Sequence, residues 1–368
     1  MLRALRSCEA TGIAGEACRD AGARLVAHVR DVSGMGIAEL VPRAPAIAAA
    51  IGRLLREAVR GRHDVAILAS WSAANARIGR LLRRIGVPVC WISPPEVWAW
   101  GAYRARSVAR AADLLVPTLP FEEAIFTKAG GHARYVGHPA LDVVLPDRTA
   151  LRAALGLHDR PAVAILPGSR AGEVDRLIEP FVSAGRLSRG VSEARLVVAP
   201  SLPAGTRARA TARAILAGIP CVDAPPDGAG ALLSAFDASI VSSGTASLEA
   251  ALAGAPPVVA YRMHSLTAAI ARRVVRSPWI ALPNVILGRA AFPERLQDDV
   301  TPRALVEALG SVLGNAEARA ACDEVRAVLS RSLDRQSCWA ERVARLVERV
   351  ARPSERPRHP LGGSMEAR

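Results

Sequence analysis

The segment AVAILPGSRAGEV, residues 162–174, passes from five consecutive apolar residues through a Pro-Gly-Ser-Arg turn into a helical pattern. Such an apolar run is typical of a strand buried on both faces of a parallel sheet. The turn has two interpretations: an ordinary strand-to-helix connection, or a loop that holds an anion. Gly168, which lets a ligand approach the backbone, and Arg170, whose donors suit phosphate, favour the second. Pro180 is expected to open the main helix after the turn.

Apolar runs alternate with helical patterns on both sides of this segment, which predicts parallel sheets covered by helices. We expect strands at 64–68, 87–92, 112–116, 133–136, 162–166, 195–199, 219–222, 237–242 and 257–261. We expect helices at 72–85 and 245–253, and a long charged helical stretch at 303–350.

The pattern breaks near residues 145–148, and a chain of 368 residues suits two domains. The predicted fold class is α/β, with two Rossmann-like, doubly wound domains facing a cleft. Residues 1–146 form the first domain, and residues 147–350, with long C-terminal helices, form the second. The Pro-, Gly- and Arg-rich tail at 351–368 is expected to be disordered. Ligands of such sheets bind beyond the carboxyl ends of the strands.

Composition excludes several classes of protein. The six cysteines contain no C-x-x-C pair, which argues against structural zinc or a disulfide framework and fits a reducing cytoplasm. No apolar run approaches the ~20 residues that cross a bilayer, and the first residues lack the apolar core of a secretion signal. The net charge of +14 fits solvated helix faces, such as residues 77–84, or attraction to a polyanion. No nucleic-acid-binding pattern is present, so an anionic membrane surface is the favoured polyanion.

A second polar loop follows the apolar run at 237–242. Ser243, Gly244 and Thr245 stand where a helix begins, and small hydroxyl residues are common helix caps. Glu249 lies about one turn into that helix, and helical side chains lean back toward the N-terminus. Its carboxylate could accept both hydroxyls of a ribose while loop N–H groups meet a diphosphate. Two such loops at strand ends of one domain predict a nucleotide-diphosphate site.

Three tryptophans, Trp91, Trp98 and Trp100, cluster in a chain that has only six. They form either an aromatic corner of the core or an amphipathic wall near a membrane or an acyl chain.

These stretches resemble the lipid-A-disaccharide synthase family of inverting glycosyltransferases. The matching motifs are MGIAE at 35–39, SPPEVWAW at 93–100, LPFE at 119–122, VGHP at 136–139, LPGSR at 166–170 with Glu173, SGTASLE at 243–249, YRM at 261–263 and LPN at 282–284. The resemblance covers about residues 12–345.

The resemblance implies a GT-B fold whose C-terminal domain binds UDP. The implied reaction transfers 2,3-diacylglucosamine from UDP to 2,3-diacylglucosamine 1-phosphate and releases UDP, so the partners are UDP-diacylglucosamine and diacylglucosamine 1-phosphate. The resemblance implies no metal, no cofactor and no nucleic-acid partner. The implied location is cytoplasmic, peripheral on the cytoplasmic face of the inner membrane, and a homodimer is compatible with the family. The implied UDP-sugar-binding residues are Gly168, Ser169, Arg170, Glu173, Ser243, Gly244, Thr245, Glu249, Arg262 and Asn284.

The sequence departs from the family pattern at two places. The family opens with a strand and a Gly-Glu-Ser/Pro-Ser-Gly-Asp loop that have no counterpart before LRALRS at 2–7. We therefore expect the first domain to lack its first, central strand, which leaves two strands unpaired or forces them to close up. The second departure is SWSAAN at 70–75, where Ser70 and Ala73 replace two carboxylates of the family loop.

The identity of the general base is consequently undetermined, because Ser and Ala cannot accept the proton of the acceptor hydroxyl. The candidates are Asn75, Glu96 and His138, and His138 is equally well explained as a hydrogen-bonded structural histidine. An active glycosyltransferase with a shifted base is the first hypothesis. A non-catalytic relative that binds UDP-sugar or lipid is the second, and a UDP-sugar epimerase of the same fold is a weaker third.

Overall fold

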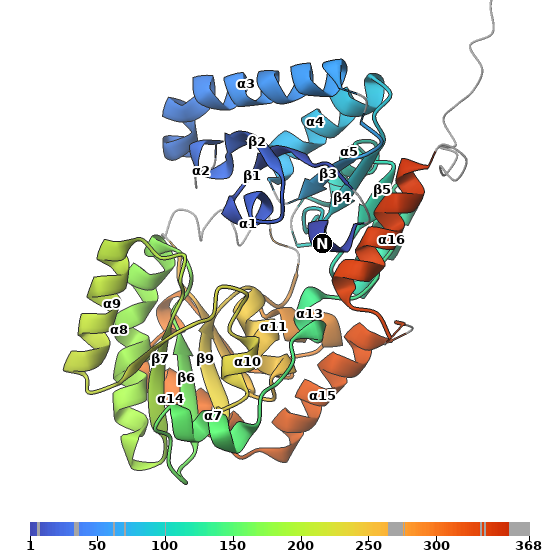
Figure 1. The fold of residues 1–368 in the computed structure, drawn as a ribbon. Coiled ribbons are helices and arrows are strands. Elements are labelled where there is room, and N and C mark those ends of the chain that lie inside the picture. The colour runs from blue at the N-terminus through green and yellow to red at the C-terminus, as the bar shows by residue number, and fades with distance from the viewer. Residues whose placement is uncertain are drawn as a thin grey trace, which may run out of the picture. The chain divides into compact units, whose positions relative to one another are not determined.

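The computed structural model describes residues 1–5, 8–32, 37–61, 63–69, 71–99, 101–263, 275, 277–331, 333–334 and 336–352 (Figure 1). The chain divides into two compact units. The first unit is Met1–Gly137 together with Leu333–Arg368, and the second is His138–Ser332. The boundary thus lies before the predicted position at 146, and the C-terminal segment that we predicted in the second domain packs with the first unit.

The first unit carries its elements in two separate stretches of chain. In order they are η1 (Leu2–Ala4), β1 (Thr11–Ala14), α1 (Glu16–Arg19), β2 (Arg24–His28), α2 (Val29–Val32), α3 (Ile37–Arg60), β3 (Ala66–Ala69), α4 (Ser72–Arg84), β4 (Val89–Ile92), η2 (Ala102–Arg104), α5 (Ala105–Ala109), β5 (Leu114–Val116), α6 (Pro120–Lys128) and α16 (Trp339–Ala351).

The strands of the first unit form two sheets rather than one. β1 pairs with β2, while β3, β4 and β5 form a three-stranded sheet, and all of these pairs are parallel. β1 and β3 therefore each have one hydrogen-bonded neighbour among the described strands. The described strands of this unit are thus divided between a two-stranded and a three-stranded parallel sheet.

Helix α16 explains why the C-terminal segment belongs to the first unit. Val343, Val347 and Val350 recur at helical spacing, and they pack against Cys90 and Leu114 of the three-stranded sheet. The opposite face of that sheet, including Trp91 and Leu115, packs with residues of α4 and α5. Helices on both faces bury this sheet, as its continuous apolar strands require.

The second unit contains η3 (Pro139–Asp142), α7 (Arg148–Ala154), β6 (Ala162–Leu166), α8 (Ala171–Leu187), η4 (Ser188–Gly190), β7 (Glu193–Val198), α9 (Ala204–Leu216), β8 (Cys221–Asp223), α10 (Gly230–Leu233), β9 (Ala238–Ser242), α11 (Thr245–Leu252), β10 (Pro257–Tyr261), α13 (Leu282–Leu287), β11 (Glu294–Leu296), η5 (Gln297–Asp299), α14 (Pro302–Val312) and α15 (Ala316–Ser330).

These strands form one parallel sheet in the order β11-β10-β9-β6-β7-β8 (Figure 1). β6 lies in its interior, and successive residues face opposite sides. Val163 and Ile165 pack in the core that includes α8 and α14, whereas Ala164 and Leu166 pack in the core on the other face. Every residue of β6 is buried for this reason, which confirms the strand predicted at 162–166.

Several local predictions differ from the structure. Residues 133–136 form only an isolated bridge, between Ala133 and Leu115, and the stretch predicted as one long helical region is divided into α14, α15 and α16. Pro180 does not open a helix but lies inside α8, where it is buried. Its packing against the core accompanies the loss of one backbone hydrogen bond. The tail predicted to be disordered lies, from residue 353, outside the described residues.

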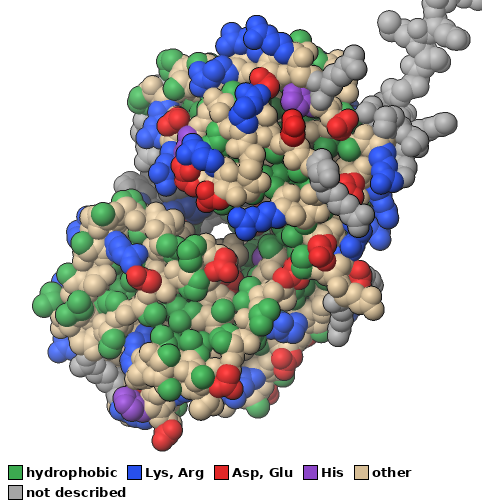
Figure 2. Space-filling view, in the orientation of Figure 1, with side chains coloured by type: hydrophobic (Ala, Val, Ile, Leu, Met, Phe, Trp, Pro, Cys, Tyr) green, Lys and Arg blue, Asp and Glu red, His purple; other side chains and the backbone are tan. Residues whose placement is uncertain are grey.

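No helix in the described ranges is long and apolar enough to cross a membrane. Basic and acidic side chains are mixed over the visible surface of each unit in Figure 2.

Candidate sugar-nucleotide site

The loops at 167–170 and 243–244 follow neighbouring strands of the second unit. β6 pairs with β9, and Leu166 is in register with Val241, so the two strands end side by side. Helices α8 and α11 begin directly after these loops. Since the first N–H groups of a helix have no partner within it, two sets of backbone donors lie at one edge of the sheet.

The first loop is closed by a contact between Gly168 and Glu173. Gly168 has φ +125°, and a Cβ there would lie 2.6 Å from Oε2 of Glu173. Glu173 is buried in the first turn of α8, and its Oε1 accepts a hydrogen bond from Arg170 at 2.8 Å. The Arg170 side chain is nevertheless 55% exposed, so a guanidinium fixed at one edge faces solvent beside the exposed Ser169.

In the second loop, Gly244 is the N-terminal cap of α11 and has φ +136°. No atom lies within 4 Å of the position that a Cβ on Gly244 would take. Ser243 donates its hydroxyl hydrogen to the carbonyl of Ile280 at 3.0 Å, which holds the loop against the segment before α13. Thr245 is exposed at the first position of the helix. The loop thus offers backbone N–H groups and one exposed hydroxyl to the same edge as Ser169 and Arg170.

Glu249 faces a loop that the sequence reasoning missed. Its Oε2 accepts a hydrogen bond from the N–H of Ala229 at 3.0 Å, and a Cβ on Gly228 would lie 2.9 Å from Oε1. Burial, and next the charge of Asp227, raise the pKa of Glu249, while the Ala229 N–H opposes this shift. The Pro-Pro-Asp-Gly sequence at 225–228 indicated a turn after β8, but not its contact with Glu249.

The side chains of Asn284 and Arg262 form hydrogen bonds with other residues of the second unit. Asn284 is fully buried; its amide donates to the Phe292 carbonyl and to Glu294, and its oxygen accepts two backbone N–H groups. A direct contact with UDP would require one of these bonds to break. Arg262 donates to the carbonyls of Gln297 and Val300. The geometry therefore favours a supporting role for both residues.

The three-stranded sheet of the first unit carries the other candidate residues. Glu96 lies on the loop after β4 with an exposed side chain, and desolvation by its surroundings raises the pKa of its carboxyl. Asn75 lies in the first turn of α4, where it is buried and donates to the Ala69 carbonyl at 3.1 Å. An amide cannot act as a base near neutral pH, so Asn75 holds the end of β3.

Glu122 is a buried carboxyl that sequence reasoning did not select, although it lies in the LPFE motif. It accepts hydrogen bonds from the Trp98 indole at 3.0 Å and from the N–H of Leu119 at 3.0 Å. Trp98 also meets Phe121 edge to face, with ring centroids 5.4 Å apart. Burial raises the pKa of Glu122 to about 7, with Glu96 contributing in the same direction. Glu122 thereby ties the loop that carries Glu96 to α6.

His138 has the geometry of a structural histidine. Its Nδ1 accepts the N–H of Ala140 at 3.1 Å and caps η3, so the neutral ring carries its hydrogen on Nε2. Burial lowers the pKa of His138 to about 4. A ring with one nitrogen engaged and the other protonated has no lone pair free to take a proton.

The described tryptophans of the predicted cluster differ in burial. Trp91 is fully buried in the core, which fits the first interpretation, whereas Trp98 is half-buried on the loop beside Glu122. Trp100 and Ser70 lie outside the described residues, as do residues 35–36 of the MGIAE motif, and the side chain of Ala73 is likewise not described.

Two solved glycosyltransferases share this fold. A calicheamicin glycosyltransferase has a TM-score of 0.57 at 14% identity, with 95% of this chain and 93% of that chain covered. MurG of Acinetobacter baumannii has a TM-score of 0.56 at 15% identity, with 94% of each chain covered. With its parallel α/β units, the protein has the GT-B fold of these two enzymes.

Sequence comparison identifies the family within this class. The lipid-A-disaccharide synthetase family matches residues 1–347. The lipid-A-disaccharide synthase of Myxococcus xanthus is 38% identical over 299 residues, which is 80% of this chain and 78% of that protein. The lipid-A-disaccharide synthase of Anaeromyxobacter sp. (strain K) is 37% identical over 331 residues, which is 87% of this chain and 85% of that protein. The chain belongs to the lipid-A-disaccharide synthase family, and this membership favours a glycosyltransferase over a non-catalytic relative.

Proposed function

We propose that this protein transfers 2,3-diacylglucosamine from UDP to 2,3-diacylglucosamine 1-phosphate. The observation that carries the proposal is the pairing of β6 with β9, which brings the loops at 167–170 and 243–244 to one edge of the sheet. Backbone donors of two helix N-termini and Arg170 bind the diphosphate, because both bear positive charge toward an anion. Glu249 accepts the ribose hydroxyls through the oxygen that does not bond to Ala229.

The acceptor hydroxyl attacks C1 of the donor sugar while the bond from C1 to the UDP oxygen breaks, which inverts the configuration. UDP leaves with both electrons of that bond, and a base takes the hydroxyl proton. Among the sequence candidates, Glu96 fits this role best. Asn75 is an amide, and the Nδ1 atom of His138 already accepts the Ala140 N–H. A carboxylate with a raised pKa is a stronger base and is matched more closely to neutral pH.

Both substrates carry acyl chains, so the enzyme has to meet them at a membrane surface. The net charge of +14 supports attraction to anionic lipid. A peripheral location on the cytoplasmic face of the inner membrane, and a homodimer, belong to this proposal.

The test is a turnover assay with the full chain. We expect UDP release when UDP-diacylglucosamine and diacylglucosamine 1-phosphate are both present, and only background release with either substrate alone. Tight binding of UDP without any release in the complete mixture would instead support the non-catalytic relative.

A further inference from the structure

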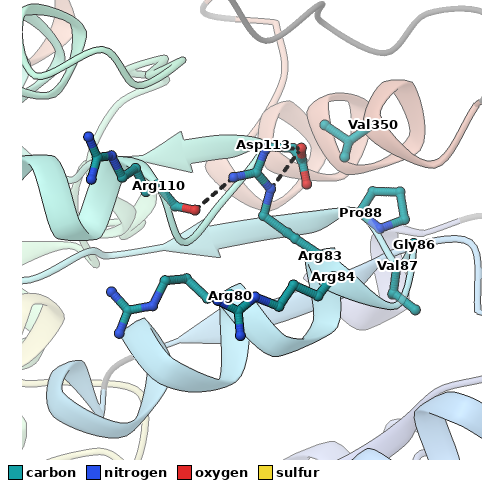
Figure 3. Close-up of a pocket in the computed structure, with 9 residues that line it drawn as sticks. All are labelled: Arg80, Arg83, Arg84, Gly86, Val87, Pro88, Arg110, Asp113 and Val350. Atoms are coloured by element: carbon teal, nitrogen blue, oxygen red, sulfur yellow. Dashed lines mark hydrogen bonds and ion pairs between the residues drawn. The ribbon is translucent and has the colours of Figure 1, made fainter. Parts of the chain in front are cut away.

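A polar pocket lies in the first unit, at the edge of the three-stranded sheet opposite Glu96. Its cavity of about 440 Å³ is lined by Gly86 to Pro88 before β4, Asp113 before β5, and Val350 of α16. The side chains of Arg80, Arg83, Arg84 and Arg110 complete the lining (Figure 3). The loops that follow β4 and β5 leave from the other ends of the same strands. The pocket is therefore separate from the candidate site of transfer.

One arginine of the pocket is held in a fixed position. The Arg83 guanidinium contacts Oδ1 of Asp113 through Nε at 3.1 Å and Nη2 at 3.0 Å, and it donates to the Arg110 carbonyl at 2.7 Å. The other carboxylate oxygen of Asp113 accepts the N–H of Val89 at 2.8 Å. Asp113 thus has bonds at both oxygens, and through Oδ1 it holds Arg83 in position.

The other three arginines are not neutralised by this carboxylate. Arg80 donates to the Ser107 hydroxyl at 3.0 Å, and Figure 3 shows Arg80 and Arg110 extending away from Asp113. Arg84 and Arg110 are exposed. Among the described residues that line the pocket, Asp113 is the only acid.

The charge balance of the pocket is strongly positive. Four guanidinium groups stand against one carboxylate, and the C-terminal end of α4 adds roughly half a negative charge. Even after the carboxylate and the helix end are counted, about two and a half positive charges remain. An anion with several oxygens would offset this repulsion, and the planar donor fork of arginine matches phosphate.

We propose that this pocket binds the phosphate group of an anionic ligand, either a free phosphate or phosphomonoester or the headgroup of an anionic lipid. Arg83 forms its preorganised wall, and Arg84 and Arg110 supply the donors that approach the ligand from solvent. This inference stands apart from the reaction proposed above, because no residue of the sugar-nucleotide site lines the pocket.

The test removes two charges inside the pocket and two outside it. The double variant Arg84→Ala/Arg110→Ala changes exposed residues of the lining. Its matched control, Arg77→Ala/Arg106→Ala, removes two exposed arginines from the same two helical regions but not from the pocket. Inorganic phosphate and glycerol 3-phosphate are titrated calorimetrically into each full-length protein with UDP in excess. Vesicles of phosphatidylglycerol, with phosphatidylcholine as the reference, are tested by co-sedimentation.

We expect the pocket variant to bind at least about tenfold more weakly than the wild type, as the loss of charge-assisted hydrogen bonds predicts. The control variant should stay within about twofold. Loss in the soluble titrations assigns the site to free phosphates, and loss confined to phosphatidylglycerol vesicles assigns it to a lipid headgroup. Equal losses in both double variants, unchanged binding in the pocket variant, or no binding by the wild type would each overturn the proposal.

Discussion

Gly168 lies against Glu173 so closely that a Cβ on the glycine would stand 2.6 Å from the carboxylate oxygen Oε2. Its φ of +125° is also a conformation that residues with side chains rarely adopt. We expect Gly168→Ala to displace the loop and to weaken UDP binding more than tenfold. The unfolding free energy should fall by roughly 1–2 kcal/mol from backbone strain alone. Calorimetric titration with UDP and thermal unfolding measure the two effects.

Gly254→Ala is the matched control for this variant. Gly254 belongs to the same unit and has φ +77°, but no atom lies within 4 Å of its Cβ position. Its substitution should cost similar backbone strain and leave UDP affinity at the wild-type value. Equal losses of affinity in the two variants would mean that general destabilisation, and not the loop at 167–170, controls binding.

Glu249→Gln tests the assignment of this carboxylate to the ribose. The amide oxygen of glutamine can still accept the Ala229 N–H, so we expect little change in stability. The loss of a charged acceptor should weaken UDP binding about 10- to 100-fold, which corresponds to roughly 1.5–3 kcal/mol. Titration with 2′-deoxyuridine diphosphate supplies the control. If the variant and the wild type discriminate equally against the deoxy ligand, Glu249 does not contact that hydroxyl.

The core of the second unit could be predicted because its signals are local. A strand buried on both faces must be apolar at every position, and Val163 and Leu166 indeed pack on opposite sides of the sheet. Gly168 and Gly244 both have positive φ at the ends of strands that proved to be neighbours. The order of strands was not predicted, but consecutive parallel strands have their carboxyl ends at one edge in any order.

The features that could not be predicted depend on contacts distant in sequence. The apolar stripe of α16 shows that the helix packs on something, but not that Cys90 and Leu114 lie beneath it. Asn284 lies in a family motif, and only the structure shows that Phe292 and Glu294 use its amide hydrogens. The Ala229 N–H at Glu249 comes from another strand end and leaves no periodic signal.

Glu96→Gln tests the proposed base. Gln cannot accept the hydroxyl proton, so we expect kcat to fall by about 10²–10⁴ while UDP affinity stays unchanged. In the wild type, kcat should rise with pH as the Glu96 carboxyl loses its proton, and this rising limb should vanish in the variant. Steady-state UDP release measured between pH 4 and 8 provides both readouts.

Glu9→Gln is the control for Glu96, since Glu9 is another exposed carboxylate of the same unit. It should retain the wild-type kcat and pH profile. A Glu96→Gln variant that matched this control would show that Glu96 is not the base.

His138 should behave as a cap and not as a catalyst. We expect His138→Asn to keep activity and stability, because the asparagine oxygen can replace Nδ1 as the acceptor for Ala140. His138→Ala should lower the unfolding free energy by about 1 kcal/mol. The lowered pKa has a defined sign: stability is fully present above the ordinary pKa of 6.5 and is lost as pH falls toward about 4. A large fall of kcat in the folded asparagine variant would restore His138 as the base.

Glu122 should give the first unit the opposite dependence on pH. Because burial raises the pKa of this carboxyl from 4.5 to about 7, the folded state binds more protons than the unfolded state in that window. Stability is therefore greatest below pH 4.5 as far as this group is concerned, and it is lost as pH rises toward 7. The linkage amounts to about 3 kcal/mol over the whole window.

Glu122→Gln removes the titration while it leaves one acceptor oxygen for either Leu119 or Trp98. We expect the variant to be less stable than the wild type at pH 5, since one hydrogen bond is lost, and the difference to shrink or reverse by pH 8. Thermal unfolding followed by tryptophan fluorescence across this range tests the sign, because Trp91 and Trp98 both belong to the first unit. A difference between the two proteins that stays constant from pH 5 to pH 8 would show that Glu122 keeps one protonation state throughout.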